Sequence, residues 1–214
     1  MFQAASSFDQ DLNTWDVSRV DSFSGMFYGA SSFDQDLSTW DVSTARYFGG
    51  MFQGASSFDQ DIGDWVVSSG IYLYYMFRRA SSFNQDIGDW DVSSGTNFDH
   101  MFDAAHAFNQ NIGDWDVSSG TDFNHMFDGA SSFDQDLSKW DVVSSGIHFN
   151  YMFRGASSFN QNLCNWSRLH IPVCLILLDA TLCVSPAHQI CVNIVEIVVL
   201  VATATTTTTM TITT

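Results

Sequence analysis

The chain of 214 residues contains few basic residues. Lysine and arginine together number 7, against 24 aspartates and glutamates, so the formal net charge is −17. Nucleic acid is therefore not an expected partner, because phosphate binding needs clustered lysine and arginine. Cations and basic surfaces match this charge better, although acidity by itself bears on solubility and steering more than on fold.

Proline and cysteine are missing from most of the chain. The two prolines are Pro172 and Pro186, and the cysteine spacings of 10, 9 and 8 residues match no zinc-binding pattern. The redox compartment cannot be inferred from the four cysteines, which are Cys164, Cys174, Cys183 and Cys191.

The start of the sequence lacks a signal peptide. Met1-Phe2 aligns with Met26-Phe27, so the chain opens inside a repeat. We interpret the chain as a fragment, or its start as an internal methionine, with any targeting segment upstream.

One 25-residue pattern fills the chain as far as residue 166. Its clearest copy, residues 26–40, reads M-F-Y-G-A-S-S-F-D-Q-D-L-S-T-W. A period of this length signals an array in which each unit buries its apolar face against its neighbours. The copies are marked by Met-Phe pairs that begin at Met1, Met26, Met51, Met76, Met101, Met126 and Met152, and by Trp15, Trp40, Trp65, Trp90, Trp115, Trp140 and Trp166.

The apolar spacing within one unit predicts a strand and a helix. Trp40 and Val42 are two residues apart, as on one face of a strand, so we expect a short strand from about Thr39 to Ser43. A helix of about nine residues is expected before it, because one stripe at helical spacing contains Val20, Phe23, Met26, Phe27 and Ala30.

Equivalent positions of successive repeats form columns, and two of these columns suggest how a unit closes. Gly29 resembles a helix stop in left-handed conformation, but Arg79 and Ala104 occupy the same column, so that conformation is not expected to be obligatory. The Asp34-Gln35-Asp36 triplet suits a turn, and asparagine replaces aspartate in other copies of it. Since a capping role accepts either residue, we predict turn capping there rather than cation binding.

These patterns predict an α/β solenoid over residues 1–166. It is expected to be a right-handed coil of seven turns, with one short parallel strand and one short helix per 25-residue repeat. Residues 167–214 form an apolar, Thr-rich tail with three open interpretations. The tail could cap the array, anchor it weakly in a membrane, or be non-native sequence from intron read-through or a frame error.

The repeat resembles the BspA-type surface-protein repeat, a leucine-rich-repeat-like class of mycoplasma lipoproteins and of algal and protist surface proteins. The resemblance rests on Met26-Phe27, Ser31-Ser32-Phe33 and Trp40-Asp41-Val42-Ser43 with their copies. It implies display on or secretion from cells and a role in adhesion or protein binding, and it transfers no catalytic residues. The asparagine ladder of ordinary leucine-rich repeats has no counterpart in its column, which holds Val20, Ala45, Gly70, Gly95 and Gly120.

An acidic column is the first candidate site. Stacked carboxylates repel one another, and Ca²⁺ could relieve that repulsion because it takes several oxygen ligands. The alternative is a solvated face on which each aspartate bonds local backbone. The column consists of Asp16, Asp41, Asp91, Asp116 and Asp141.

Two other sets stand out from their repeat-mates. His100 and His125 lie one unit apart and could begin a zinc site, but no third ligand recurs, so surface histidines are the preferred interpretation. One unit alone carries an aromatic and basic patch, and tyrosine and arginine are favoured in binding hot spots. That patch is Tyr72, Tyr74, Tyr75, Arg78 and Arg79.

The sequence shows no catalytic constellation, because no single serine or histidine is set apart from its repeat-mates as a catalytic residue would be. We therefore expect a non-enzymatic, extracellular or cell-surface binding module that engages a protein or glycan through an extended repeat face. The alternative is a structural repeat protein whose aspartate columns bind Ca²⁺. No cofactor is otherwise expected, and membrane association is left open.

Overall fold

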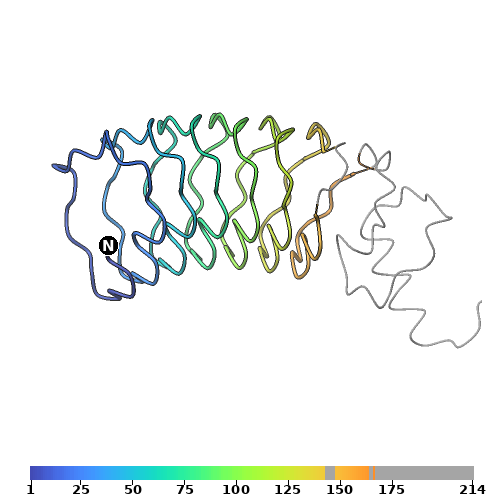
Figure 1. Cartoon of the computed structure of the whole chain (residues 1–214). Coiled ribbons are helices and arrows are strands. Elements are labelled where there is room, and N and C mark those ends of the chain that lie inside the picture. The colour runs from blue at the N-terminus through green and yellow to red at the C-terminus, as the bar shows by residue number, and fades with distance from the viewer. Residues whose placement is uncertain (143–147, 164–165, 167–214) are drawn as a thin grey trace, which may run out of the picture.

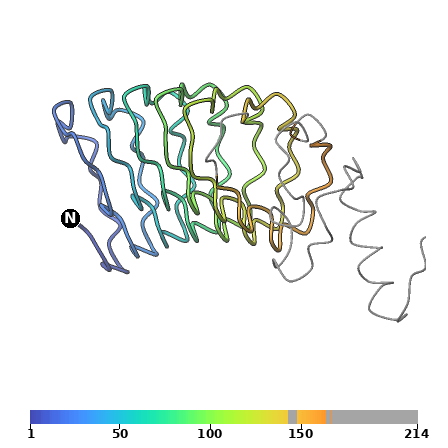
Figure 2. The same cartoon turned by 45° about the vertical axis from the view of Figure 1, so that its right-hand side comes forward.

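The computed structural model describes residues 1–142, 148–163 and 166, which wind into coils stacked along one axis (Figures 1 and 2). One repeat makes one coil, and backbone hydrogen bonds join each coil to the next. The N–H group of Phe27 donates to the carbonyl of Met51 at 2.9 Å, and the N–H group of Phe52 donates to the carbonyl of Met76 at 2.9 Å. Equivalent residues therefore lie one above another along the stack.

The prediction of an α/β solenoid with a strand and a helix in every repeat is wrong. The described residues contain no α-helix and no sheet, and a 3₁₀ conformation occurs among them only at Trp166. Strand-like pairing is limited there to isolated parallel bridges between adjacent coils. These bridges connect, in order, Ser22, Tyr47, Tyr72, Asn97, Asp122 and His148.

Two turns replace the strand expected around Trp40. The N–H group of Trp40 bonds to the carbonyl of Leu37 at 3.0 Å, and that of Ala45 bonds to the carbonyl of Val42 at 2.9 Å. Each bond closes a turn across three residues, so it uses groups that a strand would offer to its neighbours. Burial alternates as expected even so, because Trp40 and Val42 are buried while Asp41 is exposed.

A string of overlapping turns replaces the expected helix. The N–H groups of Met26, Tyr28 and Ala30 bond to carbonyls three residues earlier, at 3.0, 3.2 and 3.0 Å. At the third position of the turns that Met26 and Ala30 close, Gly25 and Gly29 have φ angles of 60° and 70°, which an α-helix does not allow. Successive turns bring an apolar side chain inward every three or four residues, so their sequence imitates a helix.

The left-handed conformation in the Gly29 column is not confined to glycine, contrary to the expectation from sequence. Arg79 and Ala104 have φ angles of 60° and 55°. In this conformation their N–H groups reach the carbonyls of Asp103 and Asp128 in the next coil, both at 2.7 Å. The bonds between coils therefore impose the backbone angle whichever residue is present.

Phenylalanine rings form columns through the interior. The ring centroid of Phe52 lies 5.6 Å from that of Phe27 and 5.6 Å from that of Phe77. Within one coil, the Phe27 and Phe33 rings stack at 4.0 Å. These rings are fully buried.

Side chains supply two further sets of bonds between coils. The indole Nε1 of each buried tryptophan donates to a carbonyl of the preceding coil, as Trp65 does to Leu37 at 3.0 Å. A carboxylate or amide oxygen at the first position of the Asp-Gln-Asp triplet accepts the N–H group of its counterpart one coil on. Asp34 Oδ1 accepts from Asp59 at 2.9 Å, and Asn84 Oδ1 accepts from Asn109 at 2.8 Å.

The first triplet position therefore forms a ladder between coils rather than the predicted turn cap. The third position does cap its turn, because Asp36 Oδ1 accepts the N–H group of Ser38 at 2.8 Å. Ordinary leucine-rich repeats join their coils through an asparagine ladder. In this chain the first position of the Asp-Gln-Asp triplet makes such bonds between coils instead.

The three interpretations of residues 167–214 fall outside the described residues. Among residues 1–142, 148–163 and 166, we find no helix capable of spanning a membrane.

Candidate functional site

Seven rings on the surface form a string across five consecutive repeats, which we call the aromatic row. Consecutive ring centroids lie 5.5, 6.4, 5.6, 4.8, 4.3 and 5.0 Å apart. None of the rings is fully buried. In order along the stack, the row consists of Tyr47, Tyr72, Tyr74, Tyr75, His100, His125 and Tyr151.

Four members of the row occupy an unfavourable backbone conformation. Gly25 and Gly50 fill the same column in the two preceding coils, with φ angles of 60° and 63°. Holding a residue other than glycine in the left-handed conformation costs roughly 1–2 kcal/mol of free energy relative to its usual conformation. The row is therefore built at some cost in stability, at φ angles of 59°, 53°, 54° and 56° for Tyr75, His100, His125 and Tyr151.

Three arginines lie over rings of the row, and each is also bonded to a carboxylate of an adjacent coil. The hydrogen bonds raise the pKa of Arg46 and of Arg154. Arg46 lies 5.5 Å from the centroid of the Tyr47 ring and bonds to the carboxylate of Asp21 at 2.7 Å. Arg78 lies 5.3 Å from the centroid of Tyr75 and bonds to Asp103 at 2.7 Å. Arg154 lies 5.1 Å from the centroid of Tyr151 and bonds to Asp128 at 3.0 Å.

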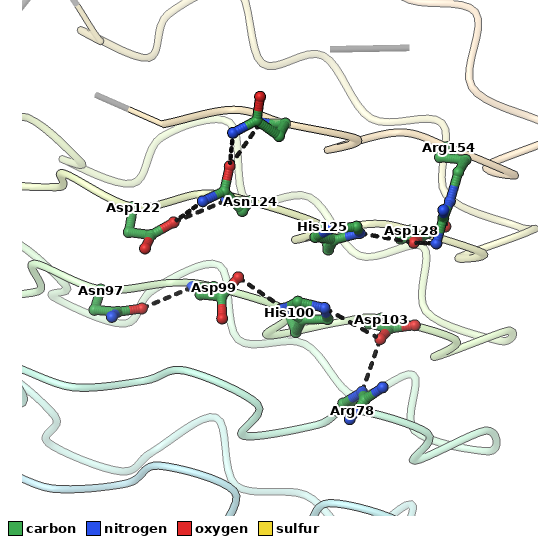
Figure 3. Close-up of polar contacts among 11 residues, drawn as sticks. Arg78, Asn97, Asp99, His100, Asp103, Asp122, Asn124, His125, Asp128 and Arg154 are labelled. Carbon is green, nitrogen blue, oxygen red and sulfur yellow. Dashed lines mark hydrogen bonds and ion pairs between the residues drawn. The ribbon is translucent and has the colours of Figure 1, made fainter. Parts of the chain in front are cut away.

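The two histidines lie between Arg78 and Arg154 (Figure 3). His100 Nδ1 lies 2.7 Å from Asp99 Oδ1, and His125 Nδ1 lies 2.9 Å from Asp128 Oδ2. The imidazole rings stack at 4.3 Å. Over the part of the chain that the structure describes, no three His, Cys, Asp or Glu side chains gather in a way that could hold a metal ion.

Tyr74 differs from the other rings because it lies flat on the coil surface. A Cβ atom placed on Gly49 would lie 2.5 Å from Cζ of Tyr74 and 2.8 Å from both Cε atoms. That geometry puts the ring face directly over Gly49, so the second face of the ring points outward. The Tyr74 ring is inclined at 71° to Tyr72 and at 86° to Tyr75.

Burial first, and then the nearby carboxylate of Asp99, raises the pKa of the Tyr75 phenol. The hydroxyl therefore stays protonated over a wide pH range. Tyr75 thus contributes a neutral ring to the row, between the Arg78 guanidinium and the His100 imidazole.

The acidic column lies on exposed surface, and four of its members cap their own turns. Asp41 Oδ1 accepts bonds from Ser43 Oγ at 2.6 Å and from Ser43 N at 3.1 Å. These bonds lower the pKa of Asp41, although the neighbouring charge of Asp16 acts in the opposite direction. The pKa values of Asp16, Asp91 and Asp116 are lowered in the same way, and Asp141 is likewise exposed.

The structure joins two sets that the sequence kept apart, because Tyr72, Tyr74 and Tyr75 continue into the stacked histidines. Arg79 lies outside the row, with an exposed side chain. Sequence reasoning missed two rings of the row, Tyr47 and Tyr151, and two of the arginines that lie over it, Arg46 and Arg154. Tyr47 shares a column with Tyr72, Tyr151 with Tyr75, and Arg154 with Arg78, and this repetition was the available signal. The fourth, Arg46, shares its column with no other arginine or ring of the row.

Comparison with known proteins gives one match. A family model described as "Mycoplasma protein of unknown function, DUF285" matches residues 1–79 and 68–166. These overlapping matches cover the whole repeat region and confirm the prediction of a repeat protein. No curated protein and no solved structure matches the chain.

Proposed function

Because the chain belongs to the DUF285 family of Mycoplasma proteins of unknown function, we propose a role for it as a non-enzymatic binding or adhesion module. We place it at the cell surface or in secreted form. The BspA-type resemblance of its repeats supports this, since that class is displayed on cells. The ligand is a protein or a glycan, and the aromatic row is the binding face.

The observation that carries the proposal is the left-handed backbone under the row. Gly25 and Gly50 satisfy the same column without strain, yet four successive coils use tyrosine or histidine there. Residues held in sparsely populated conformations cluster at ligand-binding and active sites. Glycine adopts this conformation without steric cost, so the backbone itself does not require a ring at these positions.

The repeat itself supports a binding role over a catalytic one. A catalytic site needs a nucleophile or base set apart from its neighbours in a particular geometry. The histidines of the row instead stack on each other and on tyrosines, in a line that spans several coils. Such a line offers an extended partner many similar contacts.

A binding array with paired variants tests the proposal. The labelled full-length chain is applied to immobilised oligosaccharides and extracellular proteins, beside a double variant, Tyr72→Leu with Tyr74→Leu. The control is Tyr28→Leu, because Tyr28 is 38% exposed and Tyr72 is 37% exposed, but Tyr28 is not in the row. We expect the double variant to lose ligands that the control retains. An unmodified chain that binds nothing, or equal binding by all three proteins, would contradict the proposal.

The Ca²⁺-binding structural protein is the second candidate. The lowered pKa values of the capped aspartates favour it, because they keep a negative charge on successive coils. The same serine bonds count against it, because they already use one carboxylate oxygen of each capped residue.

A further inference from the structure

The aromatic row already accommodates cations of the chain itself. Arg46, Arg78 and Arg154 each lie between 5.1 and 5.5 Å from the centroid of a tyrosine ring. A guanidinium over an aromatic face is attracted by the electron density of the ring, and a carboxylate at its edge completes the contact. The row thus contains three internal examples of one recognition chemistry.

Tyr72 and Tyr74 lack this internal partner. Within the described residues, no arginine or lysine of the chain lies over either ring. Arg46 precedes Tyr47 and covers it, whereas Ile71 precedes Tyr72 in the equivalent position. Tyr74 covers Gly49 with one face and leaves the other face outward.

The arrangement of these rings suits a long cationic side chain. Tyr74 is inclined at 71° to Tyr72 and at 86° to Tyr75, so its ring does not stack on either neighbour. Asp99 and Asp103 follow in the next coil, where they are bonded to His100 and Arg78 and add negative charge near the rings. The chain as a whole carries a net charge of −17, which draws a basic partner toward this surface.

We propose that Tyr72 and Tyr74 dock arginine or lysine side chains from a basic segment of a partner protein. This inference rests on the proposed binding function and narrows its ligand from a protein or glycan to a basic protein segment. Tyr72 and Tyr74 would each hold one such side chain, as Tyr47, Tyr75 and Tyr151 hold Arg46, Arg78 and Arg154.

A peptide titration tests this directly. The probe is a fluorescent hexa-arginine peptide added to the full-length chain, and hexa-citrulline is its neutral counterpart of nearly the same shape. We expect the arginine peptide to bind more tightly than the citrulline peptide. Its binding should weaken between about 50 and 300 mM salt, because exposed charges are then screened. The double variant of Tyr72→Leu and Tyr74→Leu should bind it about fivefold to tenfold more weakly, and Tyr28→Leu should bind it as the unmodified chain does.

A second variant separates the rings from general acidity. Arg46 covers Tyr47 from the side of the preceding coil, where it bonds to Asp21. Thr96→Arg should likewise extend toward the preceding coil and cover the face of Tyr72 that is turned toward Asn97, and so compete with the peptide while leaving the rings intact. Ile71→Arg is the matched control, because it adds the same charge next to the face of Tyr72 that is already stacked on Tyr47 at 5.5 Å. We expect Thr96→Arg to weaken binding several-fold more than Ile71→Arg. Thermal unfolding of each variant checks that the fold is retained.

Four outcomes would overturn the inference. Equal losses in Ile71→Arg and Thr96→Arg, or none in the double tyrosine variant, would leave only attraction to an acidic surface. Binding of neutral oligosaccharides through Tyr72 and Tyr74, without binding of the arginine peptide, would make the ligand a glycan and leave the proposed function intact. If the chain binds neither the peptides nor any member of the array, both the inference and the proposed binding function are rejected.

Discussion

The indole Nε1 of Trp90 donates a hydrogen bond to the carbonyl oxygen of Ile62, in the preceding coil, at 3.1 Å. The Trp90 side chain is 3% exposed, so water does not offer the carbonyl an alternative partner. This contact joins two coils through a side chain at a place where their backbones do not pair. Each tryptophan from Trp40 to Trp166 repeats it.

Trp90→Phe should lower the free energy of unfolding by about 1–3 kcal/mol, because it leaves a buried carbonyl without its donor. Urea denaturation measures the loss. Trp15→Phe is the control, because Trp15 is 38% exposed at the first coil, and it should change stability by less than about 1 kcal/mol. Equal losses in the two variants would show that the hydrogen bond contributes little.

Ala104→Gly should stabilise the chain by about 1 kcal/mol, because Ala104 has a φ angle of 55° that glycine adopts without strain. Ala107→Gly, in the same repeat, should destabilise it by about 0.5–1 kcal/mol, since glycine there only adds freedom to the unfolded chain. Thermal or urea unfolding compares the two. The backbone argument fails if both substitutions shift stability in the same direction.

Asn84→Ala should cost about 1–2 kcal/mol, because Asn84 Oδ1 accepts the N–H group of Asn109 at 2.8 Å in the ladder between coils. Asn84→Asp should cost under about 0.5 kcal/mol, since Asp59 makes the same bond to Asn84 at 2.9 Å. Urea midpoints of the two variants give the comparison. A large loss from Asn84→Asp would mean that charge, and not the acceptor oxygen, is decisive.

Stability should fall in acid because the turn caps are carboxylates. Bonds from serine lower the pKa of Asp91 and of Asp116 in the folded chain. A lowered folded pKa gives stability that is fully present above the unfolded value, about 3.9, and that is lost as the pH falls through the folded value. Urea midpoints should therefore be level above about pH 5 and drop below about pH 4.

Ser93→Ala with Ser118→Ala should flatten this acid dependence, because it removes bonds from serine hydroxyls to carboxylates that hold the two pKa values down. Ser94→Ala serves as the control, since Ser94 is an exposed neighbour of Ser93. An unchanged pH profile in the double variant would assign the acid sensitivity to other carboxylates.

Millimolar Ca²⁺ should leave the melting midpoint of the full-length chain unchanged, because serine bonds already occupy one oxygen of each capped aspartate. A ligand that binds the folded chain raises its melting midpoint. Differential scanning calorimetry with and without Ca²⁺ therefore shows whether the folded chain binds the ion. Mg²⁺ at the same concentration controls for ionic strength. A rise specific to Ca²⁺ would favour the structural alternative, and Asp41→Asn with Asp91→Asn should then reduce it.

The columns of the stack could be predicted from sequence, but the conformation of the coil could not. Period and apolar type were enough to place Phe27, Trp40 and Val42 inside, because burial depends only on which side of the chain faces the neighbours. Turns, helix and strand can each satisfy the same inward positions. The choice among them depends on the φ angles at Gly25 and Gly29 and on bonds to the next coil, which apolar spacing does not encode.

The candidate site was predicted in separate pieces for a similar reason. The odd composition at Tyr72 to Tyr75 was visible, and so was the shared column of His100 and His125. Their continuity depends on side-chain directions, such as the flat ring of Tyr74 over Gly49. That direction follows from the absence of a side chain at Gly49, one coil away, so a single repeat does not reveal it.

The Phe27, Phe52 and Phe77 rings are separated by the same 5.6 Å at each step. Any coil can therefore follow any other without a new interface having to evolve. Duplication or loss of a whole unit should change the reach of the protein while leaving its cross-section alone. The number of tyrosine- and histidine-bearing units inherited would then set how many weak contacts act together, and so how firmly one molecule holds an extended partner.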